Sequence, residues 1–84
     1  MSISRRISTV GIKQYINLAL NHADYIQNDD GTWTVKIPVI PGLITFGETK
    51  EEARVMAEDA VRGWIKIAKQ FGDKIPEIDG CSVM

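Results

Sequence analysis

The sequence predicts an α+β fold in which one long helix packs on a small antiparallel β-sheet. Three observations predict it: strict alternation of side chains over residues 32–37, a short apolar run at 43–46 after a proline–glycine pair, and an apolar stripe at helical spacing over 50–71. Alternation is typical of a half-buried strand, and the stripe is typical of an amphipathic helix. The 84 residues suffice for a single domain with one small core. Along it we expect a frayed N-terminus at 1–10, an N-terminal helix at 11–22, and the sheet, long helix and tail at 23–84.

Composition and charge argue against several classes of protein. The formal net charge is -1, from 10 basic and 11 acidic side chains, so no global field attracts nucleic acid or anionic lipid. The single cysteine cannot form an internal disulfide. No apolar run approaches the roughly 20 residues of a membrane span, and no apolar segment follows the N-terminal arginines as it would in a secretory signal. We therefore expect the protein in the cytoplasm.

The N-terminal helix is predicted from apolar residues at helical spacing. These residues are Ile12, Tyr15, Ile16, Ala19 and Ala23. Ser8 or Thr9 is expected to cap the start of the helix, because Ser and Thr side chains accept hydrogen bonds from the free backbone N–H groups of a first turn.

Residues 23–27 and 32–37 are expected to pair as a β-hairpin. The Asn, Asp and Gly residues at 28–31 are typical of a tight turn. A register that pairs Gln27 with Thr32 places Ile26, Trp33, Val35 and Ile37 on the core side together with Asp24. It places Tyr25, Gln27, Thr32, Thr34 and Lys36 on the outer side. A shift of one residue would exchange the two faces.

The segment IPVIPGLITFG, residues 37–47, leads from the hairpin to a third strand. Pro38 cannot donate to the strand ladder and is expected to end the second strand. Pro41 and Gly42 suit the two central positions of a turn, since Pro presets φ and Gly adopts the positive φ. The residues LITF then form a third strand antiparallel to the second, and Gly47 ends it.

The long helix is predicted over residues 50–71. Thr49 and Glu52 have the spacing of a capping box. Gly72 is expected to end the helix, and Pro76 keeps it from resuming. Gly63 lies inside it, where a close backbone contact would account for a glycine. The expected core stripe comprises Ala53, Met56, Ala57, Ala60, Val61, Trp64, Ala68 and Phe71. The tail at 78–83 is a candidate for a fourth strand.

No group of residues in the sequence has a pattern specific to catalysis or metal binding. His22 and Cys81 each occur once, which argues against a His/Cys metal site. Turn chemistry and the helix dipole explain the carboxylates at 29–30 and 48–52. Trp33 and Trp64 lie on apolar stripes, which favours core packing over base stacking. We therefore expect no catalytic residue, no metal and no cofactor.

The expected architecture favours a binding or self-associating module over an enzyme. The long helix is expected to cover one face of the sheet, and the N-terminal helix is too short to cover all of the other. Uncovered sheet edges are natural templates for partner strands.

The order and spacing of these motifs resemble the HicB-type antitoxin family of bacterial toxin–antitoxin pairs. The segments IPVIPG and GETKEEA follow the family patterns I-P-x-x-P-G and G-x-T-x-x-E-A. The matching residues run from about Tyr15 to Pro76. They are YI at 25–26, DGTW at 30–33, IPVIPG at 37–42, TFGET at 45–49, EEA at 51–53, Ala60, Trp64 and IP at 75–76.

This resemblance implies a degenerate ribonuclease H-like fold ordered β-β-β-α-β and a protein that is not an enzyme. It implies a domain that binds and neutralises a HicA-type toxin, a small mRNA-cleaving ribonuclease, by occluding its RNA-binding surface. It also implies self-association into dimers or tetramers. Many members carry a C-terminal DNA-binding segment, which this sequence lacks after Pro76, so direct DNA binding is not expected.

We expect the acidic side chains Asp29, Asp30, Glu48 and Glu51 to contact such a basic partner. Two alternatives remain open at this point. One is a residual metal-dependent nuclease on the ribonuclease H-like fold, using carboxylates such as Asp24, Asp29 and Asp30. The other is a homo-oligomeric binding module without a toxin partner.

Overall fold

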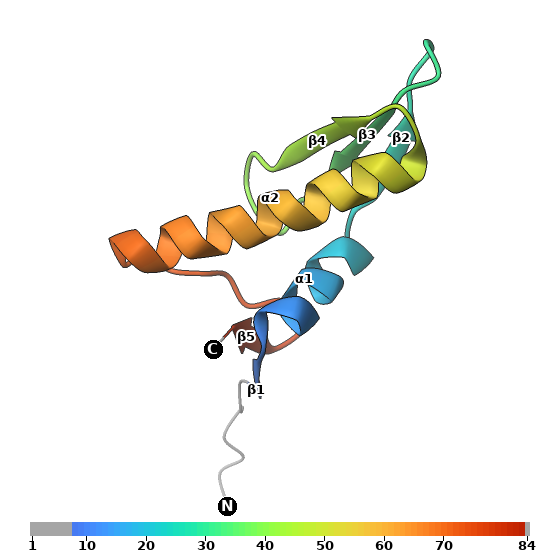
Figure 1. Ribbon diagram of the computed structural model, residues 1–84. Helices are drawn as coiled ribbons and strands as arrows, with labels where there is room; N and C mark the ends of the chain where they lie inside the picture. Colours follow the sequence, from blue (N-terminus) through green and yellow to red (C-terminus); the bar gives the residue numbers. More distant parts are fainter. Residues whose placement is uncertain (1–7, 84) are drawn as a thin grey trace, which may run out of the picture.

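Two helices lie on one face of a three-stranded sheet in the computed structural model, which describes residues 8–83 (Figure 1). The elements are β1 (Ser8–Val10), α1 (Ile12–Asn21), β2 (Asp24–Gln27), β3 (Trp33–Lys36), β4 (Ile44–Gly47), α2 (Lys50–Phe71) and β5 (Cys81–Val83). The antiparallel sheet has the order β2-β3-β4, and β1 and β5 form a separate parallel pair. The predicted α+β fold, with a small antiparallel sheet and one long helix, is confirmed.

The β2–β3 hairpin forms one residue away from the predicted register. Gln27 pairs with Trp33, and Ile26 pairs with Thr34. Ile26 is therefore 41% exposed instead of buried, and Tyr25 turns toward the core beside Val35. The same shift moves Asp24 out of the core and opposite Lys36, which removes the buried carboxylate that the predicted register required.

Asn28 is the physical reason for the shift in register. Its backbone N–H donates to the Thr32 carbonyl at 2.7 Å, so the turn takes in Thr32 as well as residues 28–31. Its side-chain amide donates to the hydroxyls of Thr32 and Thr34 at 3.0 Å each. These bonds fix a turn one residue longer than the predicted one, and the pairing along both strands follows from it.

The corner between β3 and β4 is built as the sequence predicts. The Leu43 N–H donates to the Ile40 carbonyl at 3.2 Å across Pro41 and Gly42, and Gly42 has a φ of 79°. A preceding turn, with Pro38 at its second position, is closed by a bond from the Ile40 N–H to the Ile37 carbonyl at 3.1 Å. Ile37 and Ile40 are both buried, which anchors the corner in the core.

Gly47 is the point of closest approach between the sheet and α2. A Cβ added at Gly47 would lie 2.4 Å from the backbone nitrogen of Ala53, so only glycine fits there. Nearby, the buried Thr45 hydroxyl donates to the Ala53 carbonyl at 3.0 Å. The close contact predicted at Gly63 is absent among the described residues, because an added Cβ there would meet no heavy atom within 4 Å.

The predicted bounds and caps of α2 are confirmed. The Thr49 hydroxyl accepts from the Glu52 N–H at 3.0 Å. The Glu52 carboxylate accepts from the Glu48 N–H at 3.3 Å, one residue before the donor of an ordinary capping box. At the other end Gly72 adopts a φ of 70°, and the following N–H, from Asp73, donates to the Ala68 carbonyl at 2.8 Å.

The buried stripe of α2 is rotated from the predicted one. Its buried residues are Ala53, Ala57, Val61, Ile65 and Ala68. Met56 and Phe71, predicted in the core, are 50% and 71% exposed, and the prediction missed Ile65. Small residues dominate the buried stripe because they let α2 lie close to β4, as the Gly47 contact requires.

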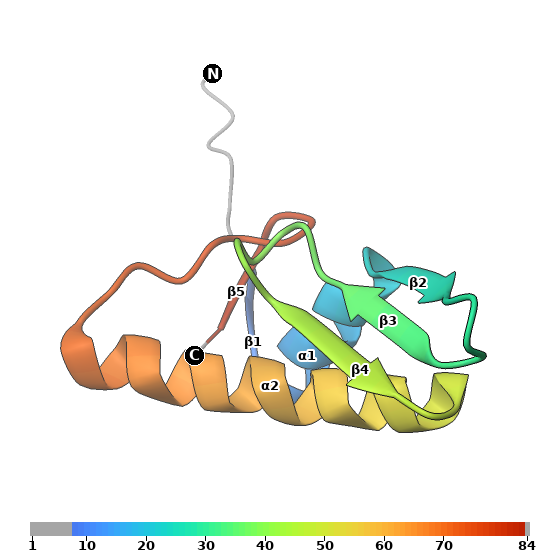
Figure 2. The same cartoon turned by 90° about the horizontal axis from the view of Figure 1, so that it is seen from above.

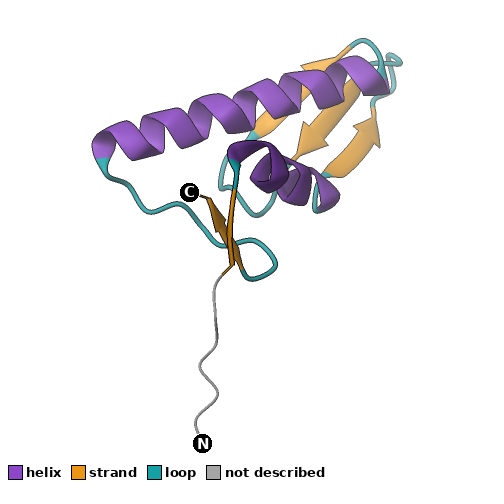
Figure 3. Ribbon diagram, turned by 60° about the horizontal axis from the view of Figure 1, so that its bottom comes forward, coloured by secondary structure: helices purple, strands orange, loops and turns teal. Residues whose placement is uncertain are grey.

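The position of α1 differs from the prediction. Figures 1 and 3 show α1 beside α2, so both helices lie on the same side of the sheet and the other side is left uncovered. Tyr15, Ile16 and Ala19 are buried as predicted, whereas Ile12 is 40% exposed. Gly11, without a side-chain cap, precedes the helix, because the predicted caps at 8–9 belong to β1.

The tail forms its strand outside the main sheet. Cys81–Val83 pair in parallel with Ser8–Val10, so the predicted fourth strand exists but does not extend β2-β3-β4. The segment predicted as frayed therefore includes a strand at 8–10, and residues 1–7 and 84 lie outside the described part. Within residues 8–83 no helix combines the length and apolarity needed to cross a bilayer.

Candidate partner-binding surface

The sheet face that points away from α1 and α2 is uncovered, and we refer to it as the open sheet face. Val35 is fully buried and the Thr45 hydroxyl bonds to α2, so their neighbours along the strands point the other way. Two cross-strand rows form this face: Ile26, Thr34 and Phe46 in one, and Asp24, Lys36 and Ile44 in the other. Ile26, Ile44 and Phe46 are 41%, 47% and 64% exposed. An apolar group of this kind on a sheet is typical of a protein-binding surface.

The polar residue at the centre of the open sheet face is satisfied within the chain. Thr34 lies between Ile26 and Phe46, is only 7% exposed, and accepts from the Asn28 amide. No buried side-chain nitrogen or oxygen in the described part of the chain lacks a hydrogen-bond partner. What this face offers to another molecule is therefore apolar contact at its centre.

A shallow apolar hollow of about 230 Å³ borders the open sheet face at the β3–β4 corner. Its lining includes Asp24, Lys36, Pro38, Pro41 and Ile44. Binding pockets for small molecules usually measure about 300–1,000 Å³, so this hollow suits one apolar side chain of a protein partner better than a metabolite. The I-P-x-x-P-G motif thus shapes a surface feature as well as the chain reversal.

The four acidic residues predicted to contact a partner lie at one end of the sheet. Asp29 and Asp30 lie in the β2–β3 turn, whereas Glu48 and Glu51 lie in the connection to α2 and its first turn. Trp33 at the start of β3 pairs with Gly47 at the end of β4, which brings both connections to the same end. All four side chains are exposed.

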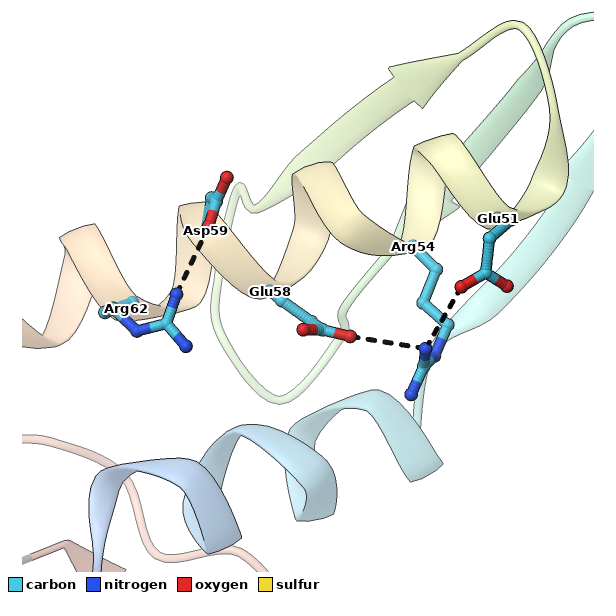
Figure 4. A network of polar contacts seen from close by, with 5 residues as sticks. All are labelled: Glu51, Arg54, Glu58, Asp59 and Arg62. Carbon is cyan, nitrogen blue, oxygen red and sulfur yellow. Dashed lines mark hydrogen bonds and ion pairs between the residues drawn. The ribbon is translucent and has the colours of Figure 1, made fainter.

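Two of these four carboxylates already have partners within the chain. Asp30 accepts from the Thr32 hydroxyl at 2.6 Å and from the Thr32 N–H at 3.0 Å, and these bonds lower the pKa of Asp30. Glu51 lies 3.5 Å from Arg54, which also pairs with Glu58 at 3.3 Å (Figure 4).

A cation also lies at this end of the sheet. The Lys50 Nζ lies 5.1 Å from the Tyr25 ring centroid and 5.6 Å from that of Trp33. Lys50 thereby covers the two half-buried aromatic rings, which lie on the helix side of the sheet. At this end of the sheet the acidic side chains lie in the connections between elements, and Lys50 lies over the rings of Tyr25 and Trp33.

His22 and Cys81, the two residues considered as metal ligands, each contact Asp79 but form no recognisable site. His22 Nε2 lies 2.9 Å from both carboxylate oxygens of Asp79, and Cys81 Sγ lies 3.8 Å from the Asp79 carbonyl oxygen. The β1–β5 pair brings these distant segments together. Across residues 8–83 no three His, Cys, Asp or Glu side chains are grouped so that they could hold a metal ion.

The sequence prediction missed Ile26, Ile44 and Phe46 as surface residues. The wrong hairpin register placed Ile26 in the core, and the apolar run LITF gave no sign of which side chains were exposed. The signal that could have found them is Gly47, because a residue that needs close contact with α2 fixes Thr45 on the same face as itself. Ile44 and Phe46 must then face away.

Comparison with known proteins places the chain in a family. The UPF0150-like family matches residues 14–76. UPF0150 protein Ta0767 of Thermoplasma acidophilum is 38% identical over 50 residues, which are 60% of this chain and 72% of that protein. Antitoxin HicB 2 of Photorhabdus laumondii is 46% identical over 35 residues, which are 42% of this chain and 25% of that protein.

A solved structure supports the fold. The crystal structure of TTHA0281 from Thermus thermophilus superimposes with a TM-score of 0.73 at 22% sequence identity, over 80% of this chain and 84% of that chain. The predicted resemblance to HicB-type antitoxins agrees with the sequence relatives. Because the family match covers most of the sequence, the chain belongs to the UPF0150-like family.

Proposed function

We propose that this protein is an antitoxin-like binding module that neutralises a HicA-type, mRNA-cleaving toxin by covering its RNA-binding surface. The observation that carries the proposal is the open sheet face, where exposed Ile26, Ile44 and Phe46 lie beside turns that carry carboxylates. Family membership and the partial similarity to Antitoxin HicB 2 support the choice of partner.

Phe46 is the expected centre of the contact. It is the most exposed of the three apolar residues on the open sheet face, at 64%. Large apolar side chains near the middle of an interface commonly supply most of its binding energy. The hollow at the β3–β4 corner would receive an apolar side chain of the partner in return.

The carboxylates at the end of the sheet are expected to guide association. A protein that binds RNA presents a basic surface, and opposite charges at the rim of an interface raise the association rate more than the affinity. The hydrogen bonds from Thr32 keep Asp30 ionised to lower pH than a free carboxyl group. Asp29 and Glu48 flank it and complete the acidic rim.

Three further features belong to the same proposal. The protein associates with itself into dimers or tetramers, and it has no catalytic activity of its own. It resides in the cytoplasm, because the proposed partner cleaves mRNA there. Its sheet and long helix represent a degenerate ribonuclease H-like fold in which only surface complementarity remains in use.

The test is binding to the product of the neighbouring reading frame. Wild type should bind that protein and stop its RNA cleavage. Phe46→Asp should weaken binding at least about tenfold, because it places a charge in a desolvated contact. Val55→Asp is the matched control, since Val55 is 46% exposed on α2 and lies away from the open sheet face. Equal binding by wild type and Phe46→Asp, or no toxin-like neighbour at all, would contradict the proposal.

The same preparation distinguishes the nuclease alternative. Wild type alone, incubated with RNA and magnesium, should cleave nothing above background. Cleavage that disappears in Asp24→Ala, Asp29→Ala or Asp30→Ala would replace the antitoxin proposal with the residual nuclease.

A further inference from the structure

A second apolar stripe runs along α2 next to the buried one. Its members are Met56, Ala60, Gly63, Trp64, Ile67 and Phe71. Their spacing of 4, 3, 1, 3 and 4 residues keeps them on one side of the helix over about four turns. Met56, Ile67 and Phe71 are 50%, 56% and 71% exposed, and the other three are half-buried. A solvent-exposed stripe of this length needs an occupant to account for it.

The stripe faces away from α1. Glu58 and Arg62 line a groove with Ile12 and Ile16 of α1, so that side of α2 points toward α1. The apolar stripe lies on the opposite side of the helix by its spacing from these residues. The C-terminal half of α2, which carries Ile67 and Phe71, also extends past the end of β4 (Figure 2). The stripe is therefore most accessible in its C-terminal part, at Ile67 and Phe71.

The charges beside the stripe change sign along the helix. Asp59 and Lys66 are seven residues apart, so they lie on the same flank of the stripe, two turns from one another. Figure 4 shows Asp59 projecting away from α1, next to Arg62, to which it is paired at 3.2 Å. The flank is acidic in the N-terminal half of α2 at Asp59 and basic in the C-terminal half at Lys66.

We infer that this stripe binds a second copy of the chain, with the two α2 helices packed antiparallel about a two-fold axis near Gly63. Such an axis keeps the same flank of both copies together and brings Asp59 of each copy to Lys66 of the other, twice in the interface. The small residues Ala60 and Gly63 lie at the axis, where they let the backbones approach.

The remaining stripe residues complement one another in the same arrangement. Met56 of one copy meets the region of Ile67 and Phe71 of the other, because the axis near Gly63 relates residues four to eight positions on either side. A two-fold contact of this kind uses the same patch on both copies and closes as a dimer. No residue of the stripe belongs to the open sheet face, so a dimer keeps that face available.

This inference specifies the self-association included in the proposed function, but it is independent of a toxin partner. Analytical ultracentrifugation of the full chain measures it directly. Ile67→Asp should raise the dimer dissociation constant at least about tenfold. Ile12→Asp adds the same charge at an apolar position that is 40% exposed on α1, on the side of the molecule away from the stripe, and should leave the constant unchanged. Circular dichroism checks that both variants remain folded.

Charge exchange tests the antiparallel arrangement without disturbing the apolar contact. Asp59→Lys and Lys66→Asp should each weaken the dimer, because each puts like charges together at both ends of the interface. The double variant D59K/K66D should restore the dimer, and an equimolar mixture of the two single variants should form heterodimers.

Three results would overturn the inference. The first is a monomeric wild type at the highest soluble concentration. The second is an Ile67→Asp variant that dimerises as wild type does, particularly if Phe46→Asp dissociates the assembly instead. The third is a pair of single charge variants that both dimerise normally. Loss of toxin binding in Phe46→Asp with an intact dimer would separate this inference from the proposed function.

Discussion

The two halves of α2 share one sequence pattern but have different surroundings. The N-terminal half packs against β4, where Gly47 and Thr45 contact Ala53 directly. The C-terminal half extends past the sheet and exposes Ile67 and Phe71. Helical periodicity therefore predicts that α2 forms and that it is amphipathic, but contacts with the rest of the fold decide which apolar side chains are buried. Ile65 and Ala68 are buried in the same half that exposes Ile67 and Phe71. The excess apolar surface is what the chain offers to other molecules.

The largest predicted effect is on the free energy of unfolding, when one side chain on each stripe of α2 is truncated to alanine. Ile65 is fully buried, so Ile65→Ala should lower the free energy of unfolding by about 3 kcal/mol through lost burial and a residual cavity. Ile67→Ala should change it by less than about 0.5 kcal/mol in the monomer, because Ile67 is 56% exposed. Urea denaturation at a protein concentration too low for dimers measures both. Equal losses would mean that the two stripes are equally buried.

The second prediction compares two glycines: Gly47 at the end of β4, which contacts the N-terminal half of α2, and Gly63 inside α2. Gly47→Ala should destabilise the fold by about 2–3 kcal/mol, because its Cβ would overlap the Ala53 backbone. Gly63→Ala should stabilise the monomer by up to about 1 kcal/mol, since the added Cβ meets open space and alanine favours a helix. Thermal and urea unfolding of both variants provide the measurement. A stable Gly47→Ala variant would refute the close approach of β4 and α2.

Features set by neighbouring residues were predictable from the sequence. The bounds of α2 follow from Thr49 and Gly72, and the β3–β4 corner follows from Pro41 and Gly42, because caps and turns are made within a few residues. The clustering of the four carboxylates also follows, since hairpin topology brings alternate connections to the same end of a sheet.

Features set by distant contacts, or by particular side-chain hydrogen bonds, were not predictable. The parallel pairing of β1 with β5 joins segments at opposite ends of the chain, and neither segment has a strong strand pattern by itself. The hairpin register depended on side-chain bonds from Asn28, which a pattern of apolar residues does not contain. That one-residue error hid the exposure of Ile26 on the open sheet face.

The smallest effect concerns the carboxylate end of the sheet that covers the N-terminal half of α2. The Thr32 hydroxyl, and then the Thr32 N–H, hold the pKa of Asp30 below its usual range. Asp30 therefore has a lower pKa in the folded state than in the unfolded state, and its bonds to Thr32 stabilise the fold while the carboxylate is ionised. That stabilisation is present at pH values above the unfolded-state pKa and is lost as the pH falls through the folded-state pKa.

Thr32→Val removes the hydroxyl and keeps the backbone donor, so it should raise the pKa of Asp30 only part of the way toward that of a free carboxyl group. Thr49→Val, which changes the same kind of side chain away from Asp30, should leave it unchanged. An NMR titration of the Asp30 carboxyl carbon measures both variants. A pKa that is the same in wild type and Thr32→Val would show that the turn does not organise this carboxylate, and Asp30 would lose its place in the acidic rim proposed for partner binding.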